Sequence, residues 1–334
     1  KSLNTDAHYA PLHSHGLART LCEFSTVKEA ALKKRTVIKG EKHHWWPKSL
    51  SKYWENERGL VQRIDIKGEV IPSKPKEFGQ ISDGHNILFE NESPWQSTIE
   101  YYFDEPDQNM PKIVGWLASL KSEVKTENTT EFLYLSQERE DENLDTLREC
   151  IISLVVRSPK YRNAQNSFVE SFRGKLEKAE SKRLIAANIN QKYKTLVQNS
   201  KGAGKFAILF SEKFEFIYGD GFYSNINAAT EHLSGLKIVI PMTPHIAVVW
   251  SSPMAYRSYP RLISIEADKE TVEIVNNSVQ VYSKEHLFFR TQKPSLIEDF
   301  KLGEHRLYSH QTDPVDRLIN SLIPDESRKY VGLF

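Results

Sequence analysis

The pattern of apolar and polar positions predicts helices before residue 205. Over residues 138–157, apolar residues recur at spacings of three and four, which is the pattern of a helix that packs one face on a core. These residues are Leu144, Leu147, Ile151, Leu154 and Val155. Arg157-Ser158-Pro159 should end this helix, because the residue before a proline avoids the α region.

The same spacing predicts further helices on either side. One covers about 163–198, and the residues of its apolar face would be Phe168, Phe172, Leu176 and Ala179. Another lies within 95–120, where Pro106 and Pro111 should break the pattern before a second helix begins at Ile113. A single helical turn is expected over 49–54.

After residue 205 the pattern becomes one of short apolar or alternating runs with turn residues between them. The runs are FAILF, FEFIYGD, LKIVIPMT, HIAVVW and RLISIEA, and they predict an antiparallel or mixed sheet. Asp268 is suited to cap a last long helix over about 269–289. Earlier in the chain, two apolar runs within 59–72 flank Lys67-Gly68, which is typical of a β-hairpin.

Together these elements predict an α+β fold: an N-terminal β-hairpin segment, a central helical layer, and a C-terminal mixed or antiparallel sheet with a long helix. With 334 residues, the chain has room for one large domain or two ordinary ones. We expect an N-terminal extension (1–38), a single α+β domain (39–294) and a C-terminal tail that packs on this domain (295–334).

Composition narrows the class of protein. The chain is 39% hydrophobic and 27% charged, and no apolar run approaches the roughly 18 residues that a membrane span needs. Cys22 and Cys150 form no metal-binding spacing, which favours a reducing, cytoplasmic compartment. The net charge of +1 gives no overall basic footprint for nucleic acid.

The stretch KGEKHHWWPKSLSKYW (39–54) places His43 and His44 next to two tryptophans and a proline, within a local excess of lysine and arginine. Neighbouring residues on a strand point to opposite faces, so the two imidazoles would serve two roles. Basic side chains nearby could hold a phosphate backbone, as could two arginines in SPMAYRSYPR. The candidates for this role are Lys34, Arg35, Lys42, Lys48, Arg257 and Arg261.

A second cluster, SDGHNILF (82–89), offers oxygen ligands from Asp83 and Asn86 and a nitrogen ligand from His85. The hairpin between the two clusters could bring this group to His43, which would complete a site for Mg²⁺ or Mn²⁺. Arg157 and Glu100 lie on or beside apolar helix stripes, where a charged group needs a partner to offset desolvation.

The order of these segments resembles the bacterial family called domain of unknown function 4238. The segments that carry this resemblance are HHWWPKSLSKYW (43–54), LVQRIDIKGEVI (60–71), WQSTIEYYF (95–103) with Glu100, LVVRSPKYR (154–162), ILFSEKF (208–214), IVIPMTPHIAVVW (238–250) and VEIVNNSVQVYSKEHLFF (272–289). It departs from the family at Ser211-Glu212, where the family tends to have Ser-Asp. The resemblance spans about 43–290 and implies a fold and candidate positions, since the family name carries no activity.

A weaker likeness to nucleases of the His-Asn-His type implies His43 as a metal ligand and His44 as the base that activates water. We therefore expect a metal-dependent nuclease, with His44, Arg157 and Glu100 as catalytic residues, acting in bacterial antiphage defence with a protein partner. Two alternatives remain open. The histidines would be structural in a non-enzymatic sensing or scaffold protein, or Arg157 and Glu100 would serve a protein that binds a small ligand or nucleotide.

Overall fold

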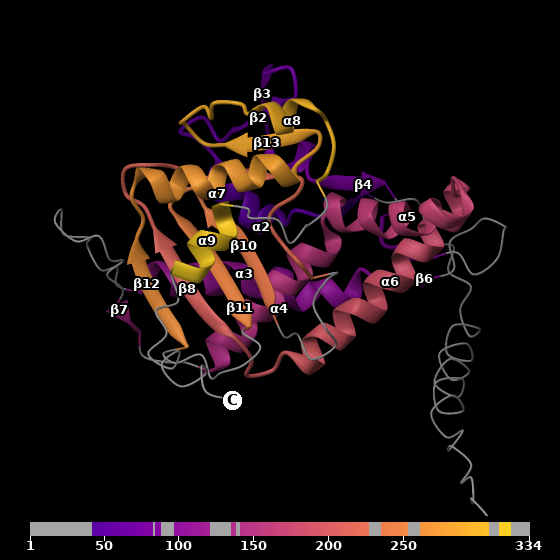
Figure 1. Cartoon of the computed structure of the whole chain (residues 1–334), viewed down its shortest axis with the longest axis horizontal. Coiled ribbons are helices and arrows are strands. Elements are labelled where there is room, and N and C mark those ends of the chain that lie inside the picture. Colours follow the sequence, from indigo (N-terminus) through magenta and orange to yellow (C-terminus); the bar gives the residue numbers. More distant parts are fainter. Residues whose placement is uncertain are drawn as a thin grey trace, which may run out of the picture.

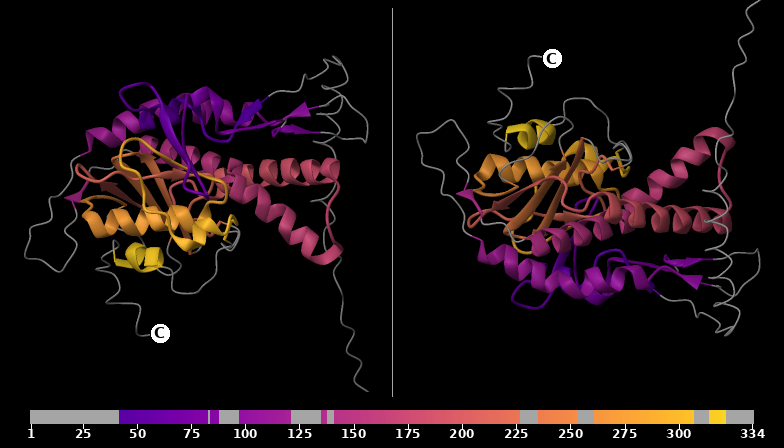
Figure 2. Two further views of the ribbon diagram at one scale, coloured as in Figure 1. Left: turned by 90° about the horizontal axis from the view of Figure 1, so that it is seen from above. Right: turned by 90° about the horizontal axis from the view of Figure 1, so that it is seen from below.

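The computed structural model describes residues 42–82, 84–87, 97–120, 135–137, 141–226, 235–252, 261–306 and 314–321. The fold is α+β, with 48% helix and 22% strand, as the sequence predicts. Two sheets and the helices around them form the body of the molecule, and helices α5 and α6 extend away from it (Figures 1 and 2). No helix within these ranges is both long and apolar enough to cross a membrane.

The larger sheet is mixed and has the strand order β10-β11-β8-β12-β7. Only β12 and β8 pair in parallel. Its strands are β7 (Leu135–Ser136), β8 (Lys205–Phe210), β10 (Leu236–Thr243), β11 (Ile246–Ser252) and β12 (Leu262–Glu266). This confirms the strands predicted from four of the five apolar runs after residue 205; in the fifth, FEFIYGD, only β9 (Tyr218–Gly219) forms.

Side chains alternate between the two faces of this sheet, and each face has its own core. On one face, Phe206, Ile208 and Trp250 pack with residues of α3 (Tyr101–Ser119) and α4 (Asp141–Arg157). On the other, Ala207 and Leu209 pack with residues of α7 (Lys269–Tyr282) and α9 (Pro314–Ser321). Figure 2 shows the sheet between these two helical layers.

The predicted hairpin is present as β2 (Val61–Asp65) and β3 (Val70–Ser73), with Gly68 in the turn at φ +85°. It does not stand apart as an N-terminal unit. The sheet order is β3-β2-β13-β9, so β13 (His286–Phe289) and β9 complete it. Trp46 stacks on Tyr218 of β9 at 4.2 Å between ring centroids, which ties the His-His-Trp-Trp-Pro segment to this sheet.

Two predicted helix boundaries are wrong. The helix expected over 163–198 is two helices, α5 (Pro159–Arg173) and α6 (Lys178–Asn199), because Gly174 takes a positive φ of +84° that ends α5. The helix expected over 269–289 ends at Tyr282, where Ser283 bonds back to Val279 O and across to Gly221 O. The residues of β13 then pair with β2 and β9.

The expected interruption of α3 is also wrong, since Pro106 and Pro111 lie inside one continuous helix. Packing of its apolar face against α4 outweighs the hydrogen bonds that the prolines remove. The expected apolar face of 163–198 is wrong at Phe168 and Phe172, which are 69% and 78% exposed, whereas Leu176 is buried but lies between α5 and α6. Both phenylalanines lie in the C-terminal half of α5, a helix that extends away from the sheets (Figure 2).

Short elements surround the candidate site. β1 (Lys42–His44) pairs with β4 (Gln80–Ser82), and β5 (Asn86–Ile87) pairs with β6 (Ser97–Thr98). The turn predicted over 49–54 is α2 (Lys48–Ser51) followed by a 3₁₀ turn (Lys52–Trp54). A second 3₁₀ turn (Pro75–Glu77) precedes β4, and α8 (Glu298–Lys301) precedes α9.

Candidate functional site

The ribbon of β1 and β4 directs His43 and His44 to different partners. In register, His43 lies opposite Ile81 and His44 opposite Gln80. The buried His43 ring lies beside the His85 ring, with 5.0 Å between centroids. The half-buried His44 ring has its Nε2 2.9 Å from the Gln80 Nε2 amide, which donates to it. The alternation of a strand therefore separates the two imidazoles, as the sequence predicts.

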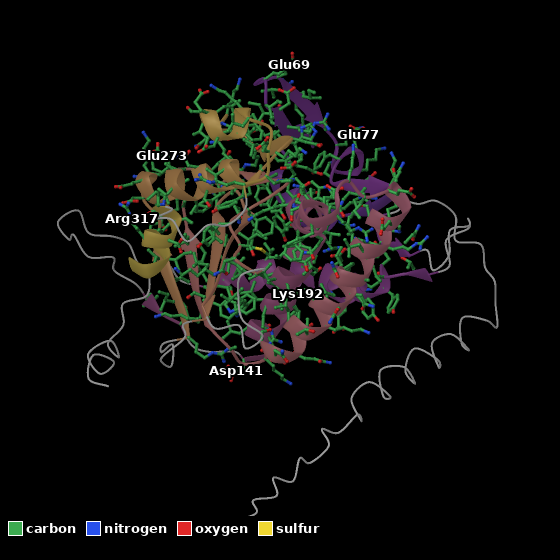
Figure 3. All side chains as sticks on the ribbon, turned by 45° about the vertical axis from the view of Figure 1, so that its right-hand side comes forward. Glu69, Glu77, Asp141, Lys192, Glu273 and Arg317 are labelled. Atoms are coloured by element: carbon green, nitrogen blue, oxygen red, sulfur yellow. The ribbon has the colours of Figure 1, made fainter. Side chains whose placement is uncertain are left out.

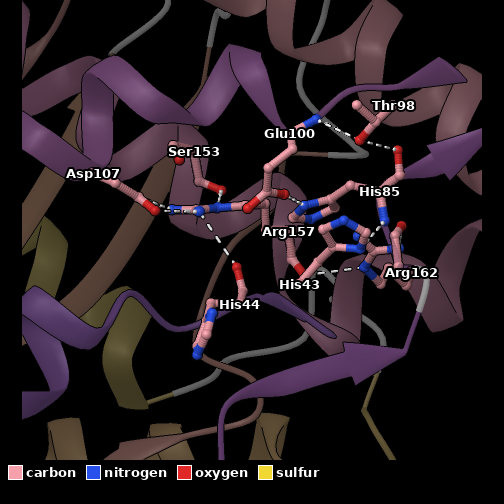
Figure 4. Close-up of polar contacts among 10 residues, drawn as sticks. His43, His44, His85, Thr98, Glu100, Asp107, Ser153, Arg157 and Arg162 are labelled. Carbon is pink, nitrogen blue, oxygen red and sulfur yellow. Dashed lines mark hydrogen bonds and ion pairs between the residues drawn. The ribbon is translucent and has the colours of Figure 1, made fainter. Parts of the chain in front are cut away.

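The center of the candidate site is a pair formed by His85 and Glu100 (Figure 4). His85 is 1% exposed, and its backbone N–H donates to Nδ1 of His43 at 3.3 Å. Its own Nδ1 pairs with the carboxylate of Glu100, whose side chain is 36% exposed. Thr98 supports the pair, because its hydroxyl donates to His85 O at 3.3 Å and accepts from Glu100 N at 3.2 Å.

This pairing fixes the tautomer of His85. A carboxylate only accepts, so Nδ1 carries the proton and Nε2 keeps its lone pair. Burial lowers the pKa of His85 well below its usual value, and the charges of Arg162 and Arg157 add to this. The single, partly solvated carboxylate of Glu100 does not outweigh them. These effects favour the neutral imidazole, with the lone pair on Nε2.

Arg157 is buried beside the site and is held by hydrogen bonds within the protein. Its guanidinium is fully buried and pairs in bidentate fashion with Asp107, at 3.0 and 2.6 Å. It also donates to Ser153 O at 3.2 Å and His44 O at 3.4 Å. Burial opposes this charge, but the ion pair with Asp107 outweighs it and raises the pKa of Arg157. The donors of Arg157 are thus directed into the protein.

Arg162 differs from Arg157 because part of its guanidinium is unused. Its Nε donates to Arg157 O at 3.2 Å and one terminal nitrogen donates to Gly84 O at 2.7 Å. The other terminal nitrogen is buried and has no hydrogen-bond partner within the described ranges. Burial and the charge of Arg157 lower the pKa of Arg162 to about 10, so it stays protonated at pH 7. A buried cation with an unfilled donor favours an anionic ligand.

The expected metal ligands come together only in part. His43, His85 and the buried Asn86 are neighbours, while Asp83 lies outside the described residues. Where the structure describes the chain, no group of three or more His, Cys, Asp or Glu side chains is placed to hold a metal ion. Nδ1 of His43 already accepts the His85 N–H, so a neutral His43 ring carries its proton on Nε2, and of the two rings His85 is the one that keeps a lone pair, on Nε2, for a metal ion. The described donors alone do not form a complete metal site.

The expected nucleic-acid contacts divide into three groups. Lys42 and Lys48 are exposed beside the histidines, and burial together with the charge of Lys48 lowers the pKa of His44. Arg261 instead pairs with Asp141 at 3.0 Å, at the first residue of α4. Arg157 is the last residue of α4, sixteen steps of about 1.5 Å or about 24 Å away. The remaining candidates, Lys34, Arg35 and Arg257, lie outside the described residues.

Figure 3 shows Asp141 at the opposite end of the molecule from Glu77, which precedes β4. Arg261 is therefore too far from the histidines to contact the same phosphate group. It would have to act on a separate part of a long substrate.

Sequence reasoning missed Asp107, Arg162 and Gln80. Asp107 had a signal, because it follows buried Phe103 by four residues and precedes buried Met110 by three on one helix. A carboxylate on an apolar stripe predicts a buried cationic partner. Arg162 and Gln80 had no such signal, since their roles depend on how α5 and β4 meet the histidines.

Comparisons with known proteins give no further guidance: no family model, curated protein or solved structure matches this chain. The resemblance to the bacterial family of unknown function stays a prediction, and function must be argued from the geometry of the site.

Proposed function

We propose that the protein hydrolyses phosphodiester bonds in nucleic acid at the His85–Glu100 pair. One observation carries the proposal. A neutral, buried histidine is oriented by a carboxylate, and beside it lies Arg162, a buried cation with one unfilled donor. A base next to an anion-binding group is the minimum that this reaction requires.

In the proposed reaction, Nε2 of His85 takes a proton from water as the water oxygen attacks phosphorus. The bond from phosphorus to the leaving oxygen breaks, that oxygen takes a proton from a solvent water, and the proton on His85 later returns to solvent. Glu100 stabilises the imidazolium that forms on His85. Arg162 stabilises the negative charge that develops on the phosphate oxygens. His44 is less suited than His85 as the base, because its Nε2 already accepts from Gln80.

A polyanionic substrate fits the charges around the pair. Glu100 is the solvent-facing member of the pair, at 36% exposure. Lys42 and Lys48 are exposed on β1 and α2, the elements that carry and follow the two histidines. They would attract a phosphate backbone to this side of the molecule, and this attraction would weaken with salt.

A divalent cation, Mg²⁺ or Mn²⁺, is also part of the proposal. His85 could offer Nε2 and Asn86 an amide oxygen, and Asp83 would have to supply a carboxylate, whereas Nε2 of His43 carries the ring proton. An imidazole nitrogen in such a set favours Mn²⁺, because Mg²⁺ prefers oxygen ligands. When bound, the cation would stabilise charge on the phosphate.

The test is cleavage of end-labelled single-stranded DNA, duplex DNA and RNA by the full chain, with Mn²⁺, with Mg²⁺ and with a chelator. We expect cleavage by the wild type and a loss of about 10²- to 10⁴-fold for His85→Gln, since a general base contributes about that much. The matched control is His44→Gln, which should keep cleavage within a few-fold of the wild type.

Three results would contradict the proposal. If the wild-type protein cleaved none of the substrates, a structural role for the histidines would be favoured. The same would follow if His85→Gln lowered the melting temperature and left cleavage by the folded protein unchanged. If His44→Gln lost cleavage and His85→Gln did not, the base would be His44, the residue that the sequence predicts.

A role against mobile DNA is a separate part of the proposal. It would be measured as reduced phage plating on cells that express the wild type. Cells that express His85→Gln should plate phage normally.

A further inference from the structure

A cavity of about 580 Å³ lies apart from the His85–Glu100 pair, between α5 and the segment 222–226. The residues that form its apolar surface are Val155, Tyr161, Ala164, Phe168, Phe222 and Ile226. Its volume falls in the range of pockets that take small organic molecules. Three of its side chains are aromatic, which favours a flat ligand.

Hydrogen bonds hold the walls of the cavity in place. Lys160 of α5 donates to Phe222 O at 3.0 Å and Ser224 O at 3.4 Å, and its ammonium lies 3.9 Å from the centroid of the Tyr282 ring. Asn225 donates to Gly235 O and accepts from Lys237 N, both at 2.7 Å. These contacts join α5 to the opposite wall, so the cavity is a built feature of the fold.

Tyr161 gives the cavity a polar group that the protein does not use. The residue is 4% exposed and lines the cavity, and within the described ranges no hydrogen bond engages its hydroxyl. Burial raises the pKa of Tyr161, so the hydroxyl stays protonated and can donate. A hydroxyl that borders the cavity and has no protein partner among the described residues is available to a ligand that supplies an acceptor.

We propose that this cavity binds a small, uncharged aromatic molecule with a hydrogen-bond acceptor, such as a carbonyl oxygen, that meets the Tyr161 hydroxyl. The ring of the ligand packs between Phe222 and Phe168, at the edge where Phe168 remains 69% exposed. This binding is independent of phosphodiester cleavage, because it uses none of the residues of the His85–Glu100 pair.

The experiment is a fluorescence titration of the full chain with Prodan, an uncharged naphthalene ketone whose emission shifts to the blue in apolar surroundings. We expect saturable binding of one Prodan per chain. Phe168→Ala should weaken it by about two- to tenfold through loss of ring packing. Tyr161→Phe should weaken it by about two- to tenfold through loss of one hydrogen bond. Ala164→Trp should abolish it by filling the cavity.

Phe172→Ala is the matched control. Phe172 lies one helical turn from Phe168, is equally exposed, and does not line the cavity. Its replacement should leave Prodan binding unchanged. Binding that falls equally in both phenylalanine variants would show adsorption to the exposed pair and overturn the proposal. Unchanged Prodan emission with wild-type protein, or unchanged binding by Ala164→Trp, would also overturn it.

Discussion

Two clusters in this molecule are built from the same three residue types and differ in how completely they are bonded. In one, Glu215 accepts from Thr291 N, Gln292 N and the Thr291 hydroxyl at 2.8–2.9 Å and from Arg290 Nε at 3.1 Å. Arg290 also contacts His245 Nε2 at 3.1 Å. In the other, His85 pairs with Glu100, and Arg162 has a buried nitrogen without a partner.

We infer from this difference that the Glu215 cluster is structural and that the His85 cluster is available to a ligand. Burial acts to raise the pKa of Glu215, but its hydrogen bonds and Arg290 outweigh it, so the pKa is lowered. The cluster around Glu215, here called the closed cluster, has its carboxylate fully hydrogen-bonded, and these contacts stabilise the fold. The cluster of His85, Glu100 and Arg162, here called the open cluster, leaves one buried nitrogen of Arg162 without a partner in the described part of the chain, which has a cost in folding. In the proposed function this nitrogen contacts the substrate.

The largest loss of stability is expected when the buried ion pair between Arg157 and Asp107, next to the open cluster, is broken. Asp107→Asn would leave the fully buried Arg157 without its counter-charge, which should lower the free energy of unfolding by about 3–5 kcal/mol. Asp104→Asn, on an exposed position of the same helix, is the control and should change it by less than about 0.5 kcal/mol. Chemical denaturation measures both. Similar values for the two variants would show that the Arg157 pair is not essential.

A smaller loss is expected from the closed cluster. Glu215→Gln removes charge-assisted hydrogen bonds and should lower the free energy of unfolding by about 2–3 kcal/mol, without changing nucleic-acid cleavage by the folded protein. Glu212→Gln, at an exposed position nearby, serves as control. If folded Glu215→Gln lost cleavage, the claim that the closed cluster is purely structural would be wrong.

The free energy of unfolding at acid pH should also depend on the carboxylate of Glu215. Because the folded-state pKa of Glu215 is below its unfolded value, its stabilisation is present above the unfolded pKa and is lost as pH falls through the folded one. Between about pH 5 and 3, stability should therefore fall less steeply in Glu215→Gln than in the wild type. Parallel curves would contradict this assignment.

The smallest stability effect is expected from Arg162→Met. This change removes a buried charge together with two hydrogen bonds to carbonyls, and these effects oppose each other, so the free energy of unfolding should move by less than about 1 kcal/mol. Cleavage should nevertheless fall at least about tenfold, since the anion-stabilising group is lost. Large destabilisation with normal cleavage per folded molecule would make Arg162 structural.

Much of the fold followed from local pattern, and the site did not. The stripe of α4, the hairpin of β2 and β3 and the strands β8, β10, β11 and β12 each have a periodicity that one segment carries alone. The end of α7 was missed because β13 forms only by pairing with strands more than 60 residues away, as at Leu287 and Gly219. Phe168 and Phe172 were placed in the core because periodicity shows which residues share a face and does not show whether anything covers it.

The sequence offered candidate residues for the site but did not show the contacts among them. His43, His85 and Glu100 were candidates, yet their pairing depends on the β1–β4 and β5–β6 ribbons, which are too short to show a pattern. The alternation of β1 correctly separated His43 from His44. It could not show which imidazole would have its Nε2 already occupied.

The protonation state of His85 is the most direct test of this account, and ¹⁵N–¹H NMR of the histidine side chains measures it, with His85→Gln to assign the signals. Burial and the charges of Arg162 and Arg157 predict a neutral ring at pH 7, protonated on Nδ1 and unprotonated on Nε2, with a pKa below 6.5. A cationic His85 at pH 7, or a proton on Nε2 in place of Nδ1, would contradict its role as the base.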